Sequence, residues 1–126
     1  MLEVAAAMIE KEGKILICRR GAGGSCAYLW EFPGGKQEPG ETLEECAVRE
    51  CREELELTIR ISGRFERVTH RYPDREVALT FFRAQCVGGS LHNHVHEEVR
   101  WVRPAELLEY EFCPADAGVV RRLAEG

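Results

Sequence analysis

Apolar and polar residues alternate along much of the chain in the two-residue period of half-buried strands. Glycine, proline and charged residues separate these segments, as at the turns Lys11-Glu12-Gly13 and Tyr72-Pro73-Asp74-Arg75. The glycine-rich stretch 21–27 is predicted to be a mobile loop, and Pro33-Gly34-Gly35 is expected to end a short extended piece. The predicted strands cover residues 3–9, 14–20, 29–32, 57–61, 65–72, 76–87 and 99–102.

Between residues 42 and 55 the hydrophobic period changes to that of an amphipathic helix. Thr42 is a candidate N-cap, with Glu45 three residues later completing a capping box; a cap one residue earlier is the alternative. The apolar residues of this helix recur at spacings of three, four and one: Leu43, Ala47, Val48, Cys51 and Leu55.

Two further helices are predicted near the C-terminus. Pro104 precedes a helix over residues 105–110, and Pro114 opens a last helix to about residue 124, since proline is tolerated in a first helical turn. The order of elements predicts an α/β fold, a mixed β-sheet with helices packed on both sides. The length of 126 residues fits one domain, 1–126.

Composition adds the class of protein. Apolar residues make up 44% and charged residues 31%, as in soluble globular proteins. No apolar run approaches the roughly 20 residues of a membrane span, and the first residues lack the features of a secretory signal. We therefore expect a cytoplasmic protein without a membrane partner. The six scattered cysteines are expected to be buried, reduced thiols.

The formal net charge of -5 argues against binding a nucleic-acid polymer, because such proteins need a basic face. Much of the acidity lies between Glu38 and Glu56. A cluster of this kind binds cations, and a metal ion then links it to phosphates.

Three carboxylates of this region, Glu50, Glu53 and Glu54, have the i, i+3, i+4 spacing of one helix face. Like charges at that spacing repel, so the arrangement makes sense if Mg²⁺ or Mn²⁺, which prefer oxygen ligands, lies among them. Arg49 would brace the carboxylates, and Gly34 and Gly35 would let the backbone approach and supply a carbonyl ligand. Any two of these glutamates alone would indicate only a solvated helix face.

The full pattern resembles the box of the Nudix hydrolase family. That box is a glycine, five residues, a glutamate, seven residues and then Arg-Glu-apolar-x-Glu-Glu-x-Gly-apolar. One position departs from it, since Glu56 stands where the family has the glycine that ends the helix. A left-handed non-glycine cap costs roughly 1 kcal/mol, so the helix has reason to end differently here. The matching residues are Gly35, Glu41, Arg49, Glu50, Cys51, Glu53, Glu54 and Leu57.

The resemblance implies a Nudix fold and assigns roles. Glu50, Glu53 and Glu54 would be metal ligands, with Glu53 the most sensitive acid, and Glu41 would support the loop or the metal shell. The family often adds an acid from the loop before the strand that contains Trp101. Glu98 is the preferred substitute here, with Glu97 as the alternative.

The segment Trp30-Glu31-Phe32-Pro33-Gly34-Gly35-Lys36 is similar to the MutT-like branch, which cleaves nucleoside triphosphates, including oxidised guanine and cytidine nucleotides. This similarity implies nucleotide contacts for Arg20 and Arg75; the alternative for each is a surface arginine. Phe32 and Tyr72 either pack on the base, as aromatic rings do, or belong to the core.

The same similarity implies that Asp116 lies at the position that reads the base, where the oxidised-guanine enzymes have asparagine. An ionised aspartate accepts hydrogen bonds only, which favours a cytidine nucleotide over strict oxidised-guanine selectivity. Asp116 could instead cap the first turn of the last helix.

His92, His94 and His96 alternate and would face one side of an extended segment. They could bind a transition metal, but a solvated, flexible loop is the favoured interpretation.

The sequence thus predicts a Mg²⁺-dependent enzyme, with Mn²⁺ as a substitute, that releases pyrophosphate and a nucleoside monophosphate from a triphosphate. Such an enzyme would cleanse the nucleotide pool and serve DNA repair, as a monomer or homodimer. The alternatives are a non-catalytic nucleotide sensor on the same fold and a Nudix hydrolase of nucleoside diphosphate derivatives.

Overall fold

The computed structural model describes residues 1–126 and contains a mixed sheet of seven strands. The central path runs β3-β2-β1-β6-β5, with β4 paired to β1 and β7 paired to β2. Strands β1 and β6 are parallel, whereas the other pairs are antiparallel. The strands are β1 (Leu2–Lys11), β2 (Lys14–Arg19), β3 (Trp30–Glu31), β4 (Gly34–Lys36), β5 (Leu57–Tyr72), β6 (Arg75–Gly89) and β7 (Glu98–Val102).

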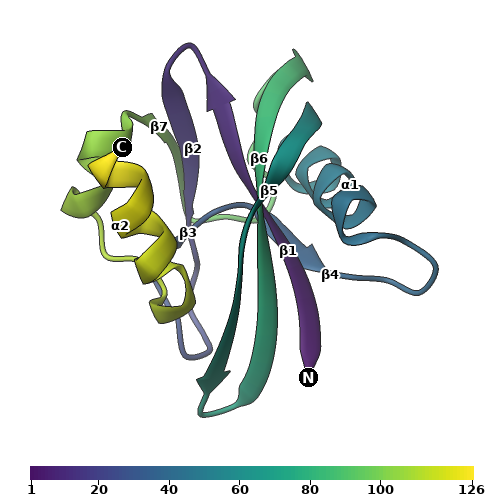
Figure 1. The fold of residues 1–126 in the computed structure, drawn as a ribbon, viewed down its shortest axis with the longest axis vertical. Coiled ribbons are helices and arrows are strands. Elements are labelled where there is room, and N and C mark those ends of the chain that lie inside the picture. Colours follow the sequence, from purple (N-terminus) through teal and green to yellow (C-terminus); the bar gives the residue numbers. More distant parts are fainter.

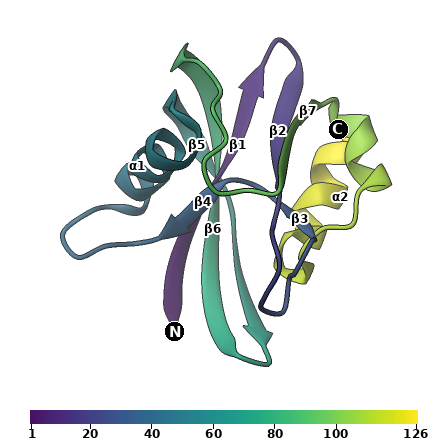
Figure 2. The same cartoon turned by 180° about the vertical axis from the view of Figure 1, so that it is seen from behind.

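Strands β1 and β2 separate soon after their turn, since they are paired only at Glu10↔Ile15 and Lys11↔Lys14. The segment between residues 30 and 36 runs into the space that opens. Its β3 part pairs with β2, and its β4 part pairs with Val4, Ala5 and Ala6 of β1 (Figure 2). This branching of the sheet brings Gly34 and Gly35 into the middle of the molecule.

Helices cover the two faces of the sheet, as Figure 1 shows with α1 (Leu43–Leu55) on one side and α2 (Ala117–Glu125) on the other. Alternate residues of β1 serve the two layers. Ala6 and Met8 belong to the core under α2, whereas Ala5, Ala7 and Ile9 belong to the core under α1. The predicted sheet between helices is therefore confirmed.

Helix α1 begins as the sequence predicts. Thr42 is the N-cap: its hydroxyl accepts from the Glu45 N–H at 3.0 Å, and the Glu45 carboxylate accepts from the Thr42 N–H at 2.8 Å. The capping box is confirmed, and the earlier cap is excluded.

Helix α1 ends at the position where the Nudix box has its glycine, although Glu56 replaces that glycine here. The helix stops at Leu55, and Glu56 itself adopts the left-handed conformation with φ of 57° and ψ of 31°. Its N–H donates to the Arg52 carbonyl at 3.1 Å. The alternative of a different helix end is therefore wrong, and contacts of Glu56 described below offset the backbone cost.

Several predicted boundaries are wrong. The Pro33-Gly34-Gly35 stretch does not only end a strand, because Gly34–Lys36 forms β4 against β1. The two strands predicted between residues 57 and 72 are one strand, β5, bent by three irregularities in its pairing with β6. The helix after Arg103 is a 3-10 helix, Pro104–Glu109, and a second one, Pro114–Asp116, precedes α2.

Removing the N-cap acceptor of α1 should destabilise the protein. We expect Thr42→Ala to lower the free energy of unfolding in urea by about 1 kcal/mol, because one N–H of the first turn loses its partner. Thr42→Ser keeps the hydroxyl and should retain most of the stability. Equal losses in the two variants would contradict this role of the cap.

Candidate active site

Arg49 organises the acidic residues around α1. Its guanidinium binds Glu41 through two bonds, from Nε at 2.9 Å and from Nη2 at 2.8 Å, and Nη1 donates to Glu50 at 2.7 Å and to Glu53 at 3.1 Å. The Arg49 hydrogen bonds, together with the Glu38 N–H, lower the pKa of Glu41 to about 2. The Arg49 guanidinium thus holds the Glu41 carboxylate, which precedes the helix, close to the two carboxylates on the helix.

Glu50 and Glu54 form a like-charged pair beside this arginine. Burial raises the pKa of Glu50, and the neighbouring Glu54 carboxylate raises it further against the effect of Arg49. Oε1 of Glu54 is buried and has no hydrogen-bond partner. Two adjacent carboxylates with an unpartnered oxygen have the chemistry of a site for a hard divalent cation.

The Glu53 side chain has a more exposed environment than those of Glu50 and Glu54. Its side chain is 57% exposed, and Arg49 draws it aside through their i, i+4 pair. No group of three or more His, Cys, Asp or Glu side chains converges as a ready set of metal ligands. The expected convergence of all three carboxylates is therefore not seen, because Arg49 occupies the space between Glu50 and Glu53.

The glycine pair of β4 permits two very close approaches. A Cβ on Gly34 would lie 1.9 Å from the carbonyl oxygen of Ala5, and a Cβ on Gly35 would lie 2.2 Å from Oε2 of Glu50. The Gly35 carbonyl faces α1, where it accepts from the Cys46 thiol at 3.4 Å. The backbone of β4 therefore lies directly against the Glu50 carboxylate.

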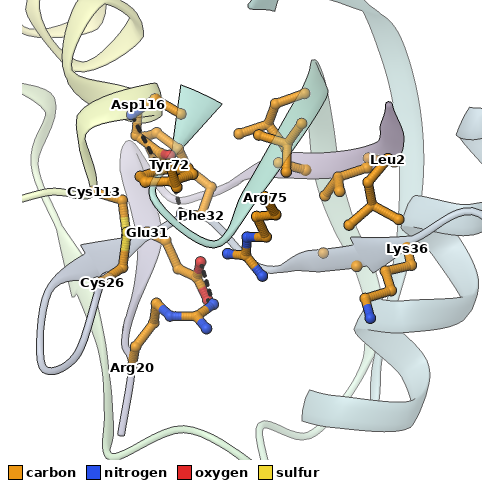
Figure 3. Close-up of a pocket in the computed structure, with 18 residues that line it drawn as sticks. Leu2, Arg20, Cys26, Glu31, Phe32, Lys36, Tyr72, Arg75, Cys113 and Asp116 are labelled. Carbon is orange, nitrogen blue, oxygen red and sulfur yellow. Dashed lines mark hydrogen bonds and ion pairs between the residues drawn. The ribbon is translucent and has the colours of Figure 1, made fainter. Parts of the chain in front are cut away.

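A cavity of about 370 Å³ opens on the other side of this backbone. It lies between β1, β4, the turn from β5 to β6 and the segment that leads into α2 (Figure 3). Apolar residues from these elements line most of it. Its polar and charged side chains are Arg20, Glu31, Lys36, Tyr72, Arg75 and Asp116.

The two predicted arginines both reach this cavity. Arg20 is part-buried and donates to Glu31 at 3.2 Å, while its Nε is buried without a partner. Arg75 lies over the Tyr72 ring, 5.6 Å from the ring centre. Figure 3 shows both guanidinium groups at the cavity, with Arg75 exposed and Arg20 part-buried.

Phe32 and Tyr72 belong to the core, which is one of the two roles that the sequence left open. Phe32 is 2% exposed and packs against Phe81 and Phe112, and the Tyr72 hydroxyl accepts from the Ala115 N–H at 3.1 Å. Both rings also line the cavity. They are therefore core residues that border the cavity, and their contact with a base stays a prediction.

Asp116 does not cap its helix, since its side chain makes no capping bond. Its carboxylate is 3% exposed, lines the cavity, and accepts from the Phe32 N–H at 3.3 Å. Burial, and then the nearby charge of Glu31, raise the pKa of Asp116 well above its usual value. The capping alternative is therefore wrong, and Asp116 borders the cavity instead.

Glu98 is not brought to the carboxylates of α1. It shares a face of β7 with Arg100, and the two side chains form an ion pair. Arg100 lies over the rings of Trp30 and Tyr110 on the α2 side of the sheet, whereas Trp101 packs on the α1 side. Strand alternation thus turns Glu98 away from Glu50 and Glu54, and its prediction as a metal ligand is wrong.

Glu31 and Lys36 line the cavity, although no separate role for either is predicted from the sequence. Burial raises the pKa of Glu31, and Arg20 opposes that shift. Alternation about the buried Trp30 and Phe32 could have indicated that Glu31 faces the other side of its strand, but not that it meets Arg20.

Comparisons with known proteins show the family to which the chain belongs. A family model described as the NUDIX domain matches residues 4–122. A CTP pyrophosphohydrolase of Escherichia coli K12 is 39% identical over 116 residues, covering 92% of this chain and 86% of that protein. An 8-oxo-dGTP diphosphatase of the same strain is 34% identical, covering 97% of this chain and 95% of the relative.

Solved structures give the same result. The solution structure of the E. coli ORF135 protein has a TM-score of 0.82 and 36% identity, covering 96% of this chain and 86% of that one. The MutT protein of Methanosarcina mazei Go1 has a TM-score of 0.86 and 26% identity, covering 98% and 93%. None of the helices in the present chain has the length and apolar character required to cross a membrane.

The two glycines of β4 should respond differently to an added methyl group. Gly34→Ala would press against the backbone of β1, so we expect it to lower the free energy of unfolding by more than about 3 kcal/mol. Gly35→Ala meets a flexible side chain and should cost about 1 kcal/mol while displacing Glu50. Urea unfolding measures both values, and similar losses would contradict the distinction.

Proposed function

Since the chain belongs to the Nudix domain family, we propose that it is a hydrolase that converts a nucleoside triphosphate to a nucleoside monophosphate and pyrophosphate with the help of Mg²⁺. The relatives that are named for this chemistry are matched over most of their length. Mn²⁺ is the proposed substitute for Mg²⁺.

One observation carries this proposal: Gly35 belongs to both halves of the site. Its backbone lies against the Glu50 carboxylate, and it also lines the 370 Å³ cavity. A ligand with its base in the cavity would therefore extend its phosphates past β4 to the acidic face of α1. Arg20, Arg75 and Lys36 supply positive charge along this path.

The residues that would hold the metal are Glu50, Glu54 and Glu53, with the Gly34 and Gly35 backbone beside them. When bound, the ion would neutralise phosphate charge and polarise the attacking water. Glu53 remains solvent-accessible, so it can take the proton of that water on a carboxylate oxygen. Arg49 holds Glu41, Glu50 and Glu53 in place throughout.

The reaction proposed is in-line attack of water on the β-phosphorus. The oxygen of water joins the β-phosphorus. The bond from the β-phosphorus to the oxygen that bridges it to the α-phosphorus breaks, which releases the nucleoside monophosphate. Pyrophosphate retains the oxygen from water. Positioning and charge neutralisation supply most of the catalysis, because phosphoryl transfer needs little covalent help from the protein.

In the cavity, Phe32 and Tyr72 would contact the base, and Asp116 would read its polar edge. Asp116 already accepts one backbone N–H, so its remaining hydrogen-bonding capacity depends on its protonation. A protonated Asp116 both donates and accepts, like asparagine, whereas the ionised form only accepts. Both cytidine and oxidised guanine nucleotides are therefore proposed substrates.

Loss of the proposed proton acceptor tests the activity. Glu53→Gln should reduce kcat by about 10²–10⁴-fold with an unchanged thermal melting curve, because the side chain keeps its size but no longer accepts the proton. Pyrophosphate release with Mg²⁺ measures the rate. Glu44→Gln, an exposed change in the first turn of the same helix, is the matched control.

A rate for Glu53→Gln close to that of the unaltered protein would reject this assignment. The absence of pyrophosphate release from every triphosphate tested would favour the nucleotide sensor instead.

The raised pKa of Asp116 predicts a pH-dependent base preference. Below that pKa the neutral carboxyl adds a donor, and above it the charge leaves acceptors only. We expect the ratio of kcat/KM for 8-oxo-dGTP to that for dCTP to fall about tenfold as pH rises through the transition. A ratio within one enzyme cancels ionisations that affect both substrates alike.

Asp116→Asn cannot titrate, so its ratio should stay constant and favour 8-oxo-dGTP. Competition assays with 8-oxo-dGTP, dCTP, CTP and 5-methyl-dCTP measure both proteins, over the whole pH range in which they stay folded. A flat ratio in the unaltered protein would contradict the role given to Asp116.

A further inference from the structure

The histidine-containing segment before β7 is attached to the C-terminal end of α1. The His92 N–H donates to the Leu55 carbonyl at 2.9 Å, and the His94 N–H donates to the Glu54 carbonyl at 3.0 Å. These carbonyls belong to the last turn of the helix, where no partner is available within the helix. The segment is solvated as predicted, since His92 and His94 are exposed, but its backbone is also hydrogen-bonded to the end of the helix.

Glu56, the residue that departs from the Nudix box, adds a side-chain contact to this attachment. Nε2 of His94 lies 2.5 Å from its Oε2, and Nδ1 of His92 lies 3.8 Å from its Oε1. The hydrogen bond with His94 lowers the pKa of Glu56. A glycine at this position would leave both imidazoles without a partner on the helix.

His96 has a different environment from the other two histidines. Its side chain is only 7% exposed, whereas those of His92 and His94 are more than half exposed. Asn93 fixes its backbone, since Nδ2 donates to the His96 carbonyl at 2.7 Å and Oδ1 accepts from the His96 N–H at 2.8 Å. The Asn93 side chain therefore fixes the backbone of His96, and this backbone sets the direction of the His96 ring.

The buried ring nitrogen of His96 faces Glu54. Nε2 lies 3.5 Å from Oε1 of Glu54, and neither atom has a hydrogen-bond partner elsewhere in the protein. An approach of about 0.5 Å would give an ordinary N–H···O bond. Bonds of active sites are often long without ligand and shorten when the ligand binds.

We propose that His96 is a positioning residue that fixes the Glu54 carboxylate by donating from Nε2 to Oε1, so that the other oxygen is presented to the metal. The proposal rests on the proposed function, in which Glu54 is a metal ligand. Carboxylates that bind metals are themselves held by hydrogen bonds, and losing such a partner weakens metal binding. His96 thus supports Glu54 from the loop while Arg49 supports Glu50 from the helix.

Binding of Mn²⁺ alone, followed by electron paramagnetic resonance without any nucleotide, tests this role. His96→Leu removes the donor but keeps an apolar side chain of similar size, and we expect its dissociation constant for Mn²⁺ to rise about tenfold. His96→Gln places an N–H at similar reach and should restore most of the affinity. His92→Leu, which removes an exposed imidazole from the same loop, should bind Mn²⁺ normally.

Kinetics provide the second measurement. The Mg²⁺ concentration for half-maximal activity should rise in His96→Leu, whereas kcat at saturating Mg²⁺ should change little, because the ligand is misplaced but not removed. Unchanged Mn²⁺ affinity in His96→Leu would overturn the proposal. Equal weakening in His96→Gln and His96→Leu would also overturn it, since the ring would then act by its shape.

If His96→Leu does not fold, a comparison of Glu54→Gln with the unaltered protein still gives an answer, because both keep the His96 ring. The nitrogen resonances of the His96 ring should shift in Glu54→Gln, and no shift would overturn the proposal. Failure of the proposed function has a separate signature, which is that the unaltered protein releases no pyrophosphate from any triphosphate, whatever the His96 variants do to Mn²⁺ binding.

Discussion

The contact of the β4 backbone with its neighbours is the constraint on which the rest of the site depends. Gly34 lies against the main chain of β1, and Gly35 lies against Glu50, at distances that leave no room for a Cβ. The sheet, the acidic helix and the cavity therefore meet at two residues. Because β1 and β2 separate, this segment can enter the sheet, and one backbone surface can serve both the phosphates and the base.

The charges around α1 explain how its acidic face is stable without a bound ligand. Arg49 forms ion pairs with Glu41, Glu50 and Glu53, so its single positive charge is shared among three carboxylates, and it forms none with Glu54. Repulsion between Glu50 and Glu54 is thus incompletely relieved within the protein. A bound cation would remove this repulsion. The two carboxylates therefore lower the stability of the protein without a ligand and favour the binding of a cation, a relation between stability and function that is common at active sites.

The end of α1 and the loop before β7 form one unit. Glu56 takes the left-handed conformation that a glycine would adopt without strain, and its carboxylate contacts His94 in return. The loop then caps the last carbonyls of the helix and brings His96 to Glu54. A departure from the family pattern that looked like a defect in the helix end thereby supplies an anchor for the neighbouring loop.

The sequence by itself determined what depends on neighbours along the chain: the strand alternation, the Thr42 capping box and the helical spacing of Glu50, Glu53 and Glu54. The box pattern also determined the family. It could not determine which way each carboxylate turns, because that depends on where Arg49 and residues from distant strands lie. Only the tertiary structure separated Glu98 from the site, brought His96 into it and buried Asp116 beside Glu31, since strand pairing and burial arise from contacts between segments far apart in the chain.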